Sequence, residues 1–458
     1  MYDLVIKNGN IVGLDNIFKG NIYIKDEKIV AITTEDLNVD SRNTYDATGM
    51  YIFPGGIDCH AHLNDPGYNW REDFIHGSKA AAAGGITTII DMPLQNEPAV
   101  TNKEIFKAKE EYLKNRSVVD YALWGGLVDN NIEDLEGLYE AGAVALKAFI
   151  GPVSPDYSSV HMGIVREAMK IASKLDLLLG FHCEDYSIIK TNEKIAIENG
   201  KLSRRDYLDS RPVVAELLAT RNIIDLARET GARVHICHVS HPEVAEEIKK
   251  AQTEGIKVTA ETCPHYLIFT DEDLMEKGMI FKCAPPLRKK EEMEELWNYV
   301  IDGTINCIAS DHSPCALEEK SEEEHNVFGA WGGISGIQNG FQIMFNEVVH
   351  KRHLSPTLLT KTLSYGPAKT FGLYPSKGLL NPGSDGDLVI VDPEKEWEIN
   401  SDSLFYKNKI SAFVGQKGKG LPIVTVVRGK VVYREGKIEV EPGYGKLFKN
   451  LRDQEKKF

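Results

Sequence analysis

The sequence has no run of about 18 consecutive apolar residues, the length that a membrane-spanning helix needs. Its first residues, MYDLVIKNGN, also lack the basic segment and apolar stretch of a secretory signal. Positive charge is not in excess, because 53 lysines and arginines against 68 acidic residues give a formal net charge of -15. Such a chain repels phosphate backbones and anionic lipid surfaces, so we expect neither a nucleic acid nor a membrane as its partner.

Cysteine is scarce, with seven widely spaced residues in the 458-residue chain. The odd number and the lack of a repeated spacing argue against a disulfide framework and favour reduced thiols. The composition shows no bias towards disorder or a collagen-like repeat, and its 42% hydrophobic content can bury one large core or two moderate ones. These absences predict a globular cytoplasmic protein.

Both ends of the chain alternate apolar and polar residues, as in YDLVIKNGNIV near the start and TVVRGKVVYREGKIEV near the end. This alternation is typical of short antiparallel strands. Because chain termini commonly lie close together, we predict that residues 1–52 and 376–440 form one small β-sandwich domain. Residues 441–458 are predicted to be a C-terminal tail.

The middle of the chain contains eight short apolar runs, each followed by a stretch with helical periodicity. Continuous apolar runs separated by helices indicate parallel strands that are buried on both faces. Eight is the number that closes a barrel filled by its own side chains. We therefore predict an α/β fold with a (β/α)8 TIM barrel over residues 53–375. The runs are 51–63, 85–94, 119–127, 143–150, 177–184, 232–240, 257–267 and 305–314.

Polar and ionisable residues gather towards the C-terminal ends of these runs. The C-terminal ends of barrel strands meet at one mouth, where active sites are built. We therefore expect six side chains to lie together: His60, His62, Lys147, His182, His238 and Asp311.

The histidines of this set have two interpretations. His60 and His62 point to the same side of a strand and can hold one metal ion, although an HxH pair also occurs by chance. His182 and His238 could each be a hydrogen-bonded core histidine. His235 lies three residues before His238 and should face the other side, so we choose His238 as the ligand.

Lys147 and Asp311 decide between these interpretations. A charged lysine inside VALKAFI is expensive to bury, unless its tip reaches the barrel mouth or pairs with a carboxylate. It could also form a Schiff base, or a carbamate whose two oxygens bridge two metals. Asp311 could cap a helix, or it could bind metal and exchange a proton with attacking water. A GxSxG elbow for a nucleophilic serine is missing. Together these residues favour a metal centre with Asp311 as the catalytic residue.

The segments that carry these residues resemble the cyclic amidohydrolases of the amidohydrolase superfamily. The resemblance rests on PGGIDCHAHLNDPG, ALKAFI, HCED, HICHVS, ETCPHY and ASDHSP, and it extends from Met1 to about Gly436. The group includes dihydroorotases, dihydropyrimidinases, hydantoinases and allantoinases. The resemblance implies a homotetramer that binds a small neutral cyclic ureide.

The resemblance also implies a centre of two divalent metals, usually zinc, with manganese, cobalt or iron as alternatives. His60, His62 and Asp311 would hold one metal, and His182 and His238 the other. Lys147, carboxylated by carbon dioxide, would bridge them. A bridging hydroxide would attack the ring carbonyl, and Asp311 would pass the proton to the leaving ring nitrogen.

Two positions at which this chain differs from related groups reduce the number of substrate classes that the resemblance allows. Dihydroorotase-like sequences carry an arginine where this chain has Asn64, which argues against a carboxylated substrate. Dihydropyrimidinases and hydantoinases carry a tyrosine at the position of Pro152, although Tyr157 could substitute for it. The resemblance does not identify a role for the loop 151–163.

The loop HLNDPGYNWREDF and the segments KCAPPLR and AWGGISGIQ resemble allantoinases. This similarity implies hydrolysis of (S)-allantoin to allantoate in purine catabolism. It places Asn64, Cys283, Gly332 and Gly333 at the substrate. The alternative is a hydantoinase or dihydropyrimidinase. A non-catalytic scaffold related to dihydropyrimidinases is less favoured, because all six ligand positions are kept.

Overall fold

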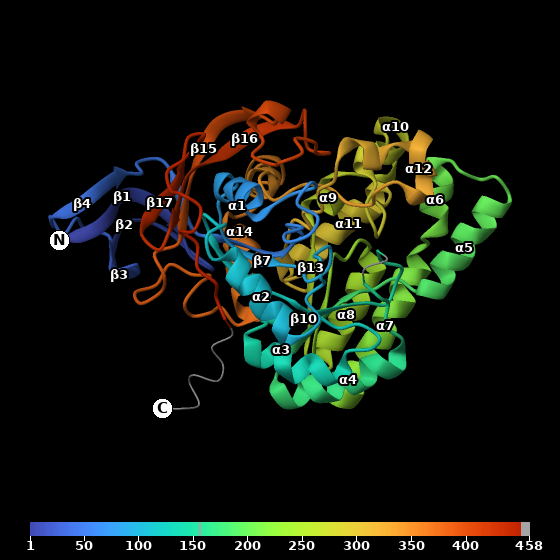
Figure 1. The fold of residues 1–458 in the computed structure, drawn as a ribbon. Helices are drawn as coiled ribbons and strands as arrows, with labels where there is room; N and C mark the ends of the chain where they lie inside the picture. The colour runs from blue at the N-terminus through green and yellow to red at the C-terminus, as the bar shows by residue number, and fades with distance from the viewer. Residues whose placement is uncertain (155–156, 450–458) are drawn as a thin grey trace.

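The computed structural model describes residues 1–154 and 157–449. Figure 1 shows strands from both ends of the chain in one sheet, next to a larger body in which helices surround a second set of strands. This is the predicted α/β architecture, a barrel with a smaller β domain built from both chain ends. Within the described residues, none of the helices is both long and apolar enough to cross a bilayer.

Each of the eight apolar runs contains a barrel strand, and neighbouring strands are parallel. A short strand, β9 (Gly125–Gly126), follows β8 and pairs with β10. The His62 amide donates to the His312 carbonyl at 2.8 Å, which joins the last strand to the first and closes the barrel. The eight strands are β6 (Gly56–Ala61), β7 (Ile86–Asp91), β8 (Asp120–Leu123), β10 (Ala145–Phe149), β11 (Leu178–His182), β12 (Arg233–Ile236), β13 (Val258–Thr262) and β14 (Cys307–Ile308).

Helices alternate with the barrel strands, as the periodicity predicts. α8 (Pro242–Thr253) begins after His241, whose ring nitrogen accepts from the Glu243 amide at 3.2 Å. It buries Val244 and Ile248 and ends before Gly255, which has a φ of +82°. The other helices are α1 (Phe74–Ala83), α2 (Lys103–Leu113), α3 (Leu135–Ala141), α4 (Met162–Leu175), α5 (Tyr186–Glu198), α6 (Arg204–Ser210), α7 (Val213–Thr230), α9 (Pro264–Ile268), α10 (Asp271–Lys277), α11 (Lys290–Ile301), α12 (Glu322–Gly329), α13 (Gly340–Phe345), α14 (Thr357–Thr360) and α15 (Gly366–Phe371).

The second sheet contains strands from both chain ends. Its central pairings place β5 between β1, which is parallel to it, and β15, which is antiparallel. Side chains from both chain ends pack in one hydrophobic cluster on this sheet. Among them are Ile6 and Ile24 from the N-terminal part, and Ile390 and Val426 from the C-terminal part. The strands are β1 (Tyr2–Val12), β2 (Ile17–Lys25), β3 (Lys28–Thr33), β4 (Ser41–Asp46), β5 (Tyr51–Pro54), β15 (Leu388–Glu398), β16 (Lys417–Val427), β17 (Lys430–Arg434) and β18 (Lys437–Ile438).

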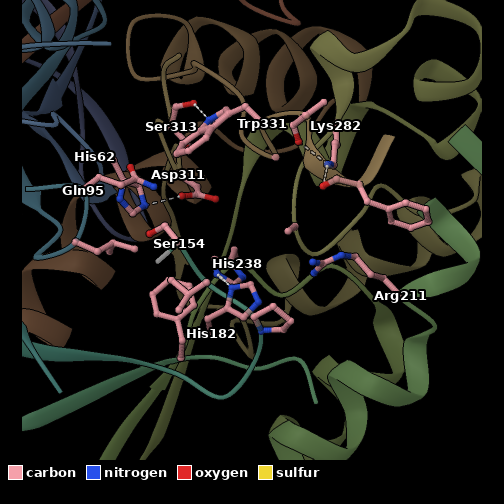
Figure 2. Close-up of a pocket in the computed structure, with 18 of the residues that line it drawn as sticks. His62, Gln95, Ser154, His182, Arg211, His238, Lys282, Asp311, Ser313 and Trp331 are labelled. Atoms are coloured by element: carbon pink, nitrogen blue, oxygen red, sulfur yellow. Dashed lines mark hydrogen bonds and ion pairs between the residues drawn. The ribbon is translucent and has the colours of Figure 1, made fainter. Parts of the chain in front are cut away.

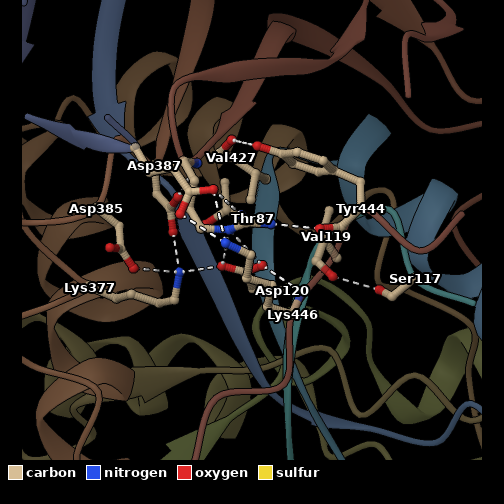
Figure 3. Close-up of polar contacts among 12 residues, drawn as sticks. Thr87, Ser117, Val119, Asp120, Lys377, Asp385, Asp387, Val427, Tyr444 and Lys446 are labelled. Atoms are coloured by element: carbon tan, nitrogen blue, oxygen red, sulfur yellow. Dashed lines mark hydrogen bonds and ion pairs between the residues drawn. The ribbon is translucent and has the colours of Figure 1, made fainter. Parts of the chain in front are cut away.

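A buried ionic cluster joins this sheet to the barrel (Figure 3). Lys377 Nζ lies 2.8 Å from Asp120 of β8, 2.6 Å from Asp387 and 3.1 Å from Asp385. Arg428, after β16, also pairs with Asp120 at 3.1 Å. The carboxylates of Asp120, Asp385 and Asp387 lie close enough together to bind a metal ion, but here all three form ion pairs with the ammonium of Lys377.

The chain after β18 returns to the barrel. The Tyr121 amide of β8 donates to the Lys446 carbonyl at 3.0 Å, and the Phe448 amide donates to the Tyr121 carbonyl at 2.7 Å. Of the predicted tail 441–458, residues 450–458 lie outside the described residues. We propose a sheet domain of residues 1–52 and 376–440, a barrel of residues 53–375 and a tail of residues 441–458. Strand β5 extends the sheet to Pro54, two residues past the proposed boundary.

Candidate metal centre

One half of the candidate centre is formed by the end of β6 and the segment after β14. His60 Nε2 lies 3.2 Å from Asp311 Oδ1, and His62 Nε2 lies 3.3 Å from the same oxygen. Asp58 holds the two segments together, because its carboxylate accepts from the His60 amide at 3.2 Å and from the Ser310 amide at 3.1 Å. Two imidazoles and one carboxylate thus converge on one point, as a divalent metal requires.

The other half is formed by the ends of β11 and β12. His182 Nδ1 lies 3.1 Å from His238 Nε2, and the His238 ring centroid lies 5.4 Å from that of His60. His235 instead points into the barrel, where it contacts Thr259 at 2.8 Å. The structure thus brings His182 and His238 towards the first group, while His235 stays in the core.

Lys147 lies on β10 and is completely buried. Its Nζ makes no hydrogen bond to a nitrogen or oxygen of any described residue, and it lies beside the Cys237 thiol, a weak acceptor. An ammonium group in such surroundings is costly, whereas an anionic derivative among metal cations would be compensated. The buried Lys147 nitrogen, without a nitrogen or oxygen partner among the described residues, therefore fits a carbamate that two metals would bind.

Carboxylates behind the histidines set the orientation of the rings. The side chain of Glu261 on β13 accepts from His60 Nδ1 and, at 3.1 Å, from His235 Nε2. Glu184 accepts from His182 Nε2 at 2.8 Å and pairs with Arg211 at 2.6 Å. These contacts leave His60 Nε2 and His182 Nδ1 free to face the centre.

Sequence reasoning missed both of these carboxylates. Their signal was available, because Glu184 lies in HCED and Glu261 in ETCPHY, next to apolar strand residues. Burial raises the pKa of Glu261, but His60 and His235 lower it by more, so its pKa lies well below the usual range.

Asp311 is held ionised by its neighbours. Burial raises its pKa, but the rings of His60, His62 and His238 outweigh this effect, so the pKa lies well below the ordinary value. Asp311 and His238 both have left-handed backbones, with φ of 44° and 39°. Non-glycine residues in this region are strained, and such strain is concentrated at functional sites.

A cavity of about 310 Å³ is lined by His60, His62, His182, His238 and Asp311. Its wall away from His62 carries two basic side chains, Arg211 and Lys282 (Figure 2). Lys282 Nζ donates to the carbonyl oxygens of Phe328 at 3.0 Å and Ala330 at 2.5 Å. Burial, together with Arg211 and Lys320, lowers the pKa of Lys282 well below its usual value. Neither basic side chain was predicted from the sequence to lie at the site.

Of the four residues expected at the substrate, Gly332 lines the cavity. Asn64, Cys283 and Gly333 do not. The Asn64 side chain donates through Nδ2 to the His62 carbonyl at 3.3 Å, and the Cys283 carbonyl accepts from the Tyr207 hydroxyl at 2.8 Å. The Gly333 carbonyl accepts from Lys320 at 2.6 Å. One polar group of each of these three residues is therefore bound within the chain, while Asn64 Oδ1 has no hydrogen-bond partner among the described residues. Their contact with a substrate remains a prediction.

Tyr157 was considered as a substitute for the missing tyrosine at Pro152. Its hydroxyl donates to the Lys147 carbonyl at 2.6 Å, and its ring packs on Phe149 with centroids 5.8 Å apart. It does not line the cavity, whereas Ser154 of the same loop does. Residues 155 and 156 of the loop 151–163 lie outside the described residues.

Comparison with known proteins finds a matching family model and similar enzymes over nearly the whole chain. Residues 51–432 match the model of the amidohydrolase family. An allantoinase from Salmonella newport (strain SL254) is 36% identical over 448 residues, which are 97% of this chain and 96% of that relative. The L-hydantoinase (dihydropyrimidinase) from Arthrobacter aurescens superposes with a TM-score of 0.96 at 34% identity, covering 98% of this chain and 100% of the other. The dihydropyrimidinase from Brevibacillus agri NCHU1002 gives 0.92 at 29% identity, with coverages of 98% and 99%.

Proposed function

Because this chain belongs to the amidohydrolase family and is a cyclic amidohydrolase, we propose that it opens the ring of (S)-allantoin to give allantoate. The observation that carries the choice of substrate is the cavity itself. The side chains of the proposed metal centre line one wall, and Arg211 and Lys282 line the other. Allantoin fits this arrangement, because its hydantoin ring carries a ureido substituent with a carbonyl acceptor.

The proposed metal centre uses the six residues already described. His60, His62 and Asp311 would hold one divalent cation, His182 and His238 the second, and carboxylated Lys147 would bridge them. The donor set of imidazoles and carboxylates suits zinc, and manganese, cobalt and iron are alternatives. When bound, the two cations activate water near neutral pH and polarise a carbonyl.

The chain's own residues then direct the reaction. Asp311, ionised and in contact with both His60 and His62, accepts the proton of the attacking water. The same carboxyl group donates this proton to the ring nitrogen as the C–N bond breaks. Glu261 and Glu184 keep the histidine rings oriented while this occurs.

The wall that carries Arg211 and Lys282 favours allantoin over unsubstituted rings. Arg211 Nε is buried and has no hydrogen-bond partner among the described residues, and Lys282 lies beside it with its nitrogen held by two carbonyls. A ureido carbonyl can satisfy these donors, whereas hydantoin and dihydrouracil carry no group there. A substrate that leaves buried donors unpaired is disfavoured.

The test is a comparison of kcat/KM for allantoin, hydantoin, dihydrouracil and dihydroorotate, on protein loaded with divalent metal and bicarbonate. We expect allantoin to be preferred. We also expect Lys282→Met to lower kcat/KM for allantoin about tenfold or more, with a smaller effect on hydantoin. A preference for hydantoin or dihydrouracil, unaffected by Lys282→Met, would favour the alternative that the similarity to the L-hydantoinase supports.

We further propose that the enzyme is a homotetramer. Exposed apolar side chains on α5, namely Ile195 and Ile197, and on α7, namely Val214 and Leu218, support self-association of this face. Light scattering of the purified protein measures the oligomer directly, and a monomeric mass would contradict the proposal.

A further inference from the structure

The loop after β10 brings one unused hydroxyl group into the cavity. Ser154 Oγ is buried and has no hydrogen-bond partner among the described residues, and Ser154 lines the cavity together with His62, His182 and Asp311. Figure 2 shows it in the part of the cavity that these ligands surround. A buried hydroxyl without a partner is costly to a fold, so its position calls for a ligand.

The other described hydroxyl groups of this loop are engaged in holding it. Tyr157 donates to the Lys147 carbonyl at 2.6 Å, Ser159 donates to the Gly151 carbonyl at 2.7 Å, and Ser158 donates to Asp129 at 2.6 Å. The Tyr157 amide also donates to the Ser154 carbonyl at 3.1 Å. Ser154 is therefore fixed by backbone contacts while its hydroxyl remains available.

We propose that Ser154 is a catalytic residue that donates a hydrogen bond to the carbonyl oxygen of the scissile ring amide. As water adds to this carbonyl, its oxygen gains negative charge, and a donor already in place stabilises that charge. The serine keeps its proton throughout, so no group is transferred to it. This inference rests on the proposed hydrolysis of a cyclic amide, but not on which ring is hydrolysed.

The proposal explains the absence of a tyrosine five residues after Lys147, where the chain has Pro152. Tyr157 cannot serve without releasing the Lys147 carbonyl, which would remove a contact that ties the loop to β10. Ser154 needs no such rearrangement, because its hydroxyl has no competing acceptor among the described residues.

The experiment compares wild type, Ser154→Ala, Ser154→Thr, Ser159→Ala and Tyr157→Phe on whichever of the four rings the wild type hydrolyses fastest. Metal content and the thermal midpoint are measured on every variant. We expect Ser154→Ala to lower kcat/KM by about 10²-fold at unchanged metal content and midpoint. Threonine keeps the hydroxyl and should recover at least a tenth of the wild-type value, and Ser159→Ala should stay within about threefold.

Two results would overturn the proposal. Ser154→Ala with kcat/KM within about threefold of wild type would show that the hydroxyl does not act. A loss of about 10²-fold in Tyr157→Phe at unchanged metal content, with Ser154→Ala unaffected, would assign the donor to the phenol. A wrong substrate assignment appears differently, as a change in the preferred ring that leaves the ratio between variants intact.

Discussion

At the scale of single residues, the burial of Lys147 bears on the chemical form of its amine. A lysine on a barrel strand normally extends its amine to water or to a carboxylate. Here Lys147 Nζ is buried beside Cys237 and Phe149. It lies 5.1 Å from the centroid of the Phe149 ring. In the proposed centre, a carbamate would replace the positive charge of this buried amine by a negative charge between two metals.

Replacement of Lys147 by alanine should abolish activity, because the proposed bridge between the metals would be lost. A small carboxylic acid such as acetate or propionate should partly restore turnover by occupying the vacated space. Activity and metal content are measured with and without added acid. Near-full activity of Lys147→Ala in the absence of acid would contradict the bridge.

Glu261→Gln should weaken metal binding about 10- to 100-fold, because His60 loses the carboxylate that orients it. Metal content after dialysis against graded chelator measures this loss. Glu216→Gln is the matched control, since Glu216 is also buried but binds Ser240 and Arg288 instead of a histidine. Equal metal retention in both variants would refute the orienting role of Glu261.

At the scale of elements, two lysines connect the segments that form one wall of the cavity. Lys320, at the end of the 3-10 helix Leu317–Lys320, donates to the carbonyls of Lys282 at 3.1 Å and Gly333 at 2.6 Å. Lys282 in turn binds the carbonyls of Phe328 and Ala330. The acidic run 318–324 therefore contains a buried lysine that connects two other segments.

The buried position of Lys320 predicts a pH dependence of stability. Burial lowers its pKa from 10.5 to about 8, so the unfolded chain binds more protons than the folded chain between these values. The free energy of unfolding of wild type should therefore rise relative to Lys320→Met as pH increases from 8 to 10, by about 1.4 kcal/mol for each unit of pKa difference. Denaturant unfolding at several pH values measures this. Lys257→Met, at an exposed position, is the control and should show no such trend.

At the scale of the whole molecule, the Lys377 cluster connects the barrel to the sheet domain. Asp120 comes from β8, Asp385 and Asp387 precede β15, and Arg428 follows β16. Burial, partly offset by Lys377, raises the pKa of Asp387 to about 6. Loss of the central ammonium would leave Asp387 without an ion-pair partner among the described residues, while Asp120 and Asp385 would keep only Arg428 and Lys28.

Lys377→Met should lower the free energy of unfolding by about 3–5 kcal/mol, the range for breaking a buried ion pair. Lys28→Met is the control, because its pair with Asp385 is half-exposed and should contribute at most about 1 kcal/mol. Thermal midpoints at fixed protein and metal concentration compare the two. Equal midpoints in both variants would show that the cluster does not hold the domains together.

Much of the fold could be predicted because its signals are local. Apolar runs of strand length, helical periodicity and alternating termini are properties of neighbouring residues, and all eight barrel strands lie in the predicted runs. The six ligands could be proposed because strand ends converge in a barrel. The substrate contacts of Asn64, Cys283 and Gly333 could not be judged, since they depend on which backbone groups other segments have already bound.

By itself, the sequence determined the barrel, the sheet built from both chain ends and the types of side chain at the barrel mouth, because these follow from composition and periodicity along the chain. The tertiary structure alone decided which groups meet. His60 and Glu261 are 201 residues apart, and Lys320 and Lys282 are 38 apart. It also separated Ser154, whose hydroxyl reaches the cavity, from Tyr157, whose hydroxyl binds the backbone. Hydrogen-bond partners are chosen by packing in three dimensions, which no local pattern records.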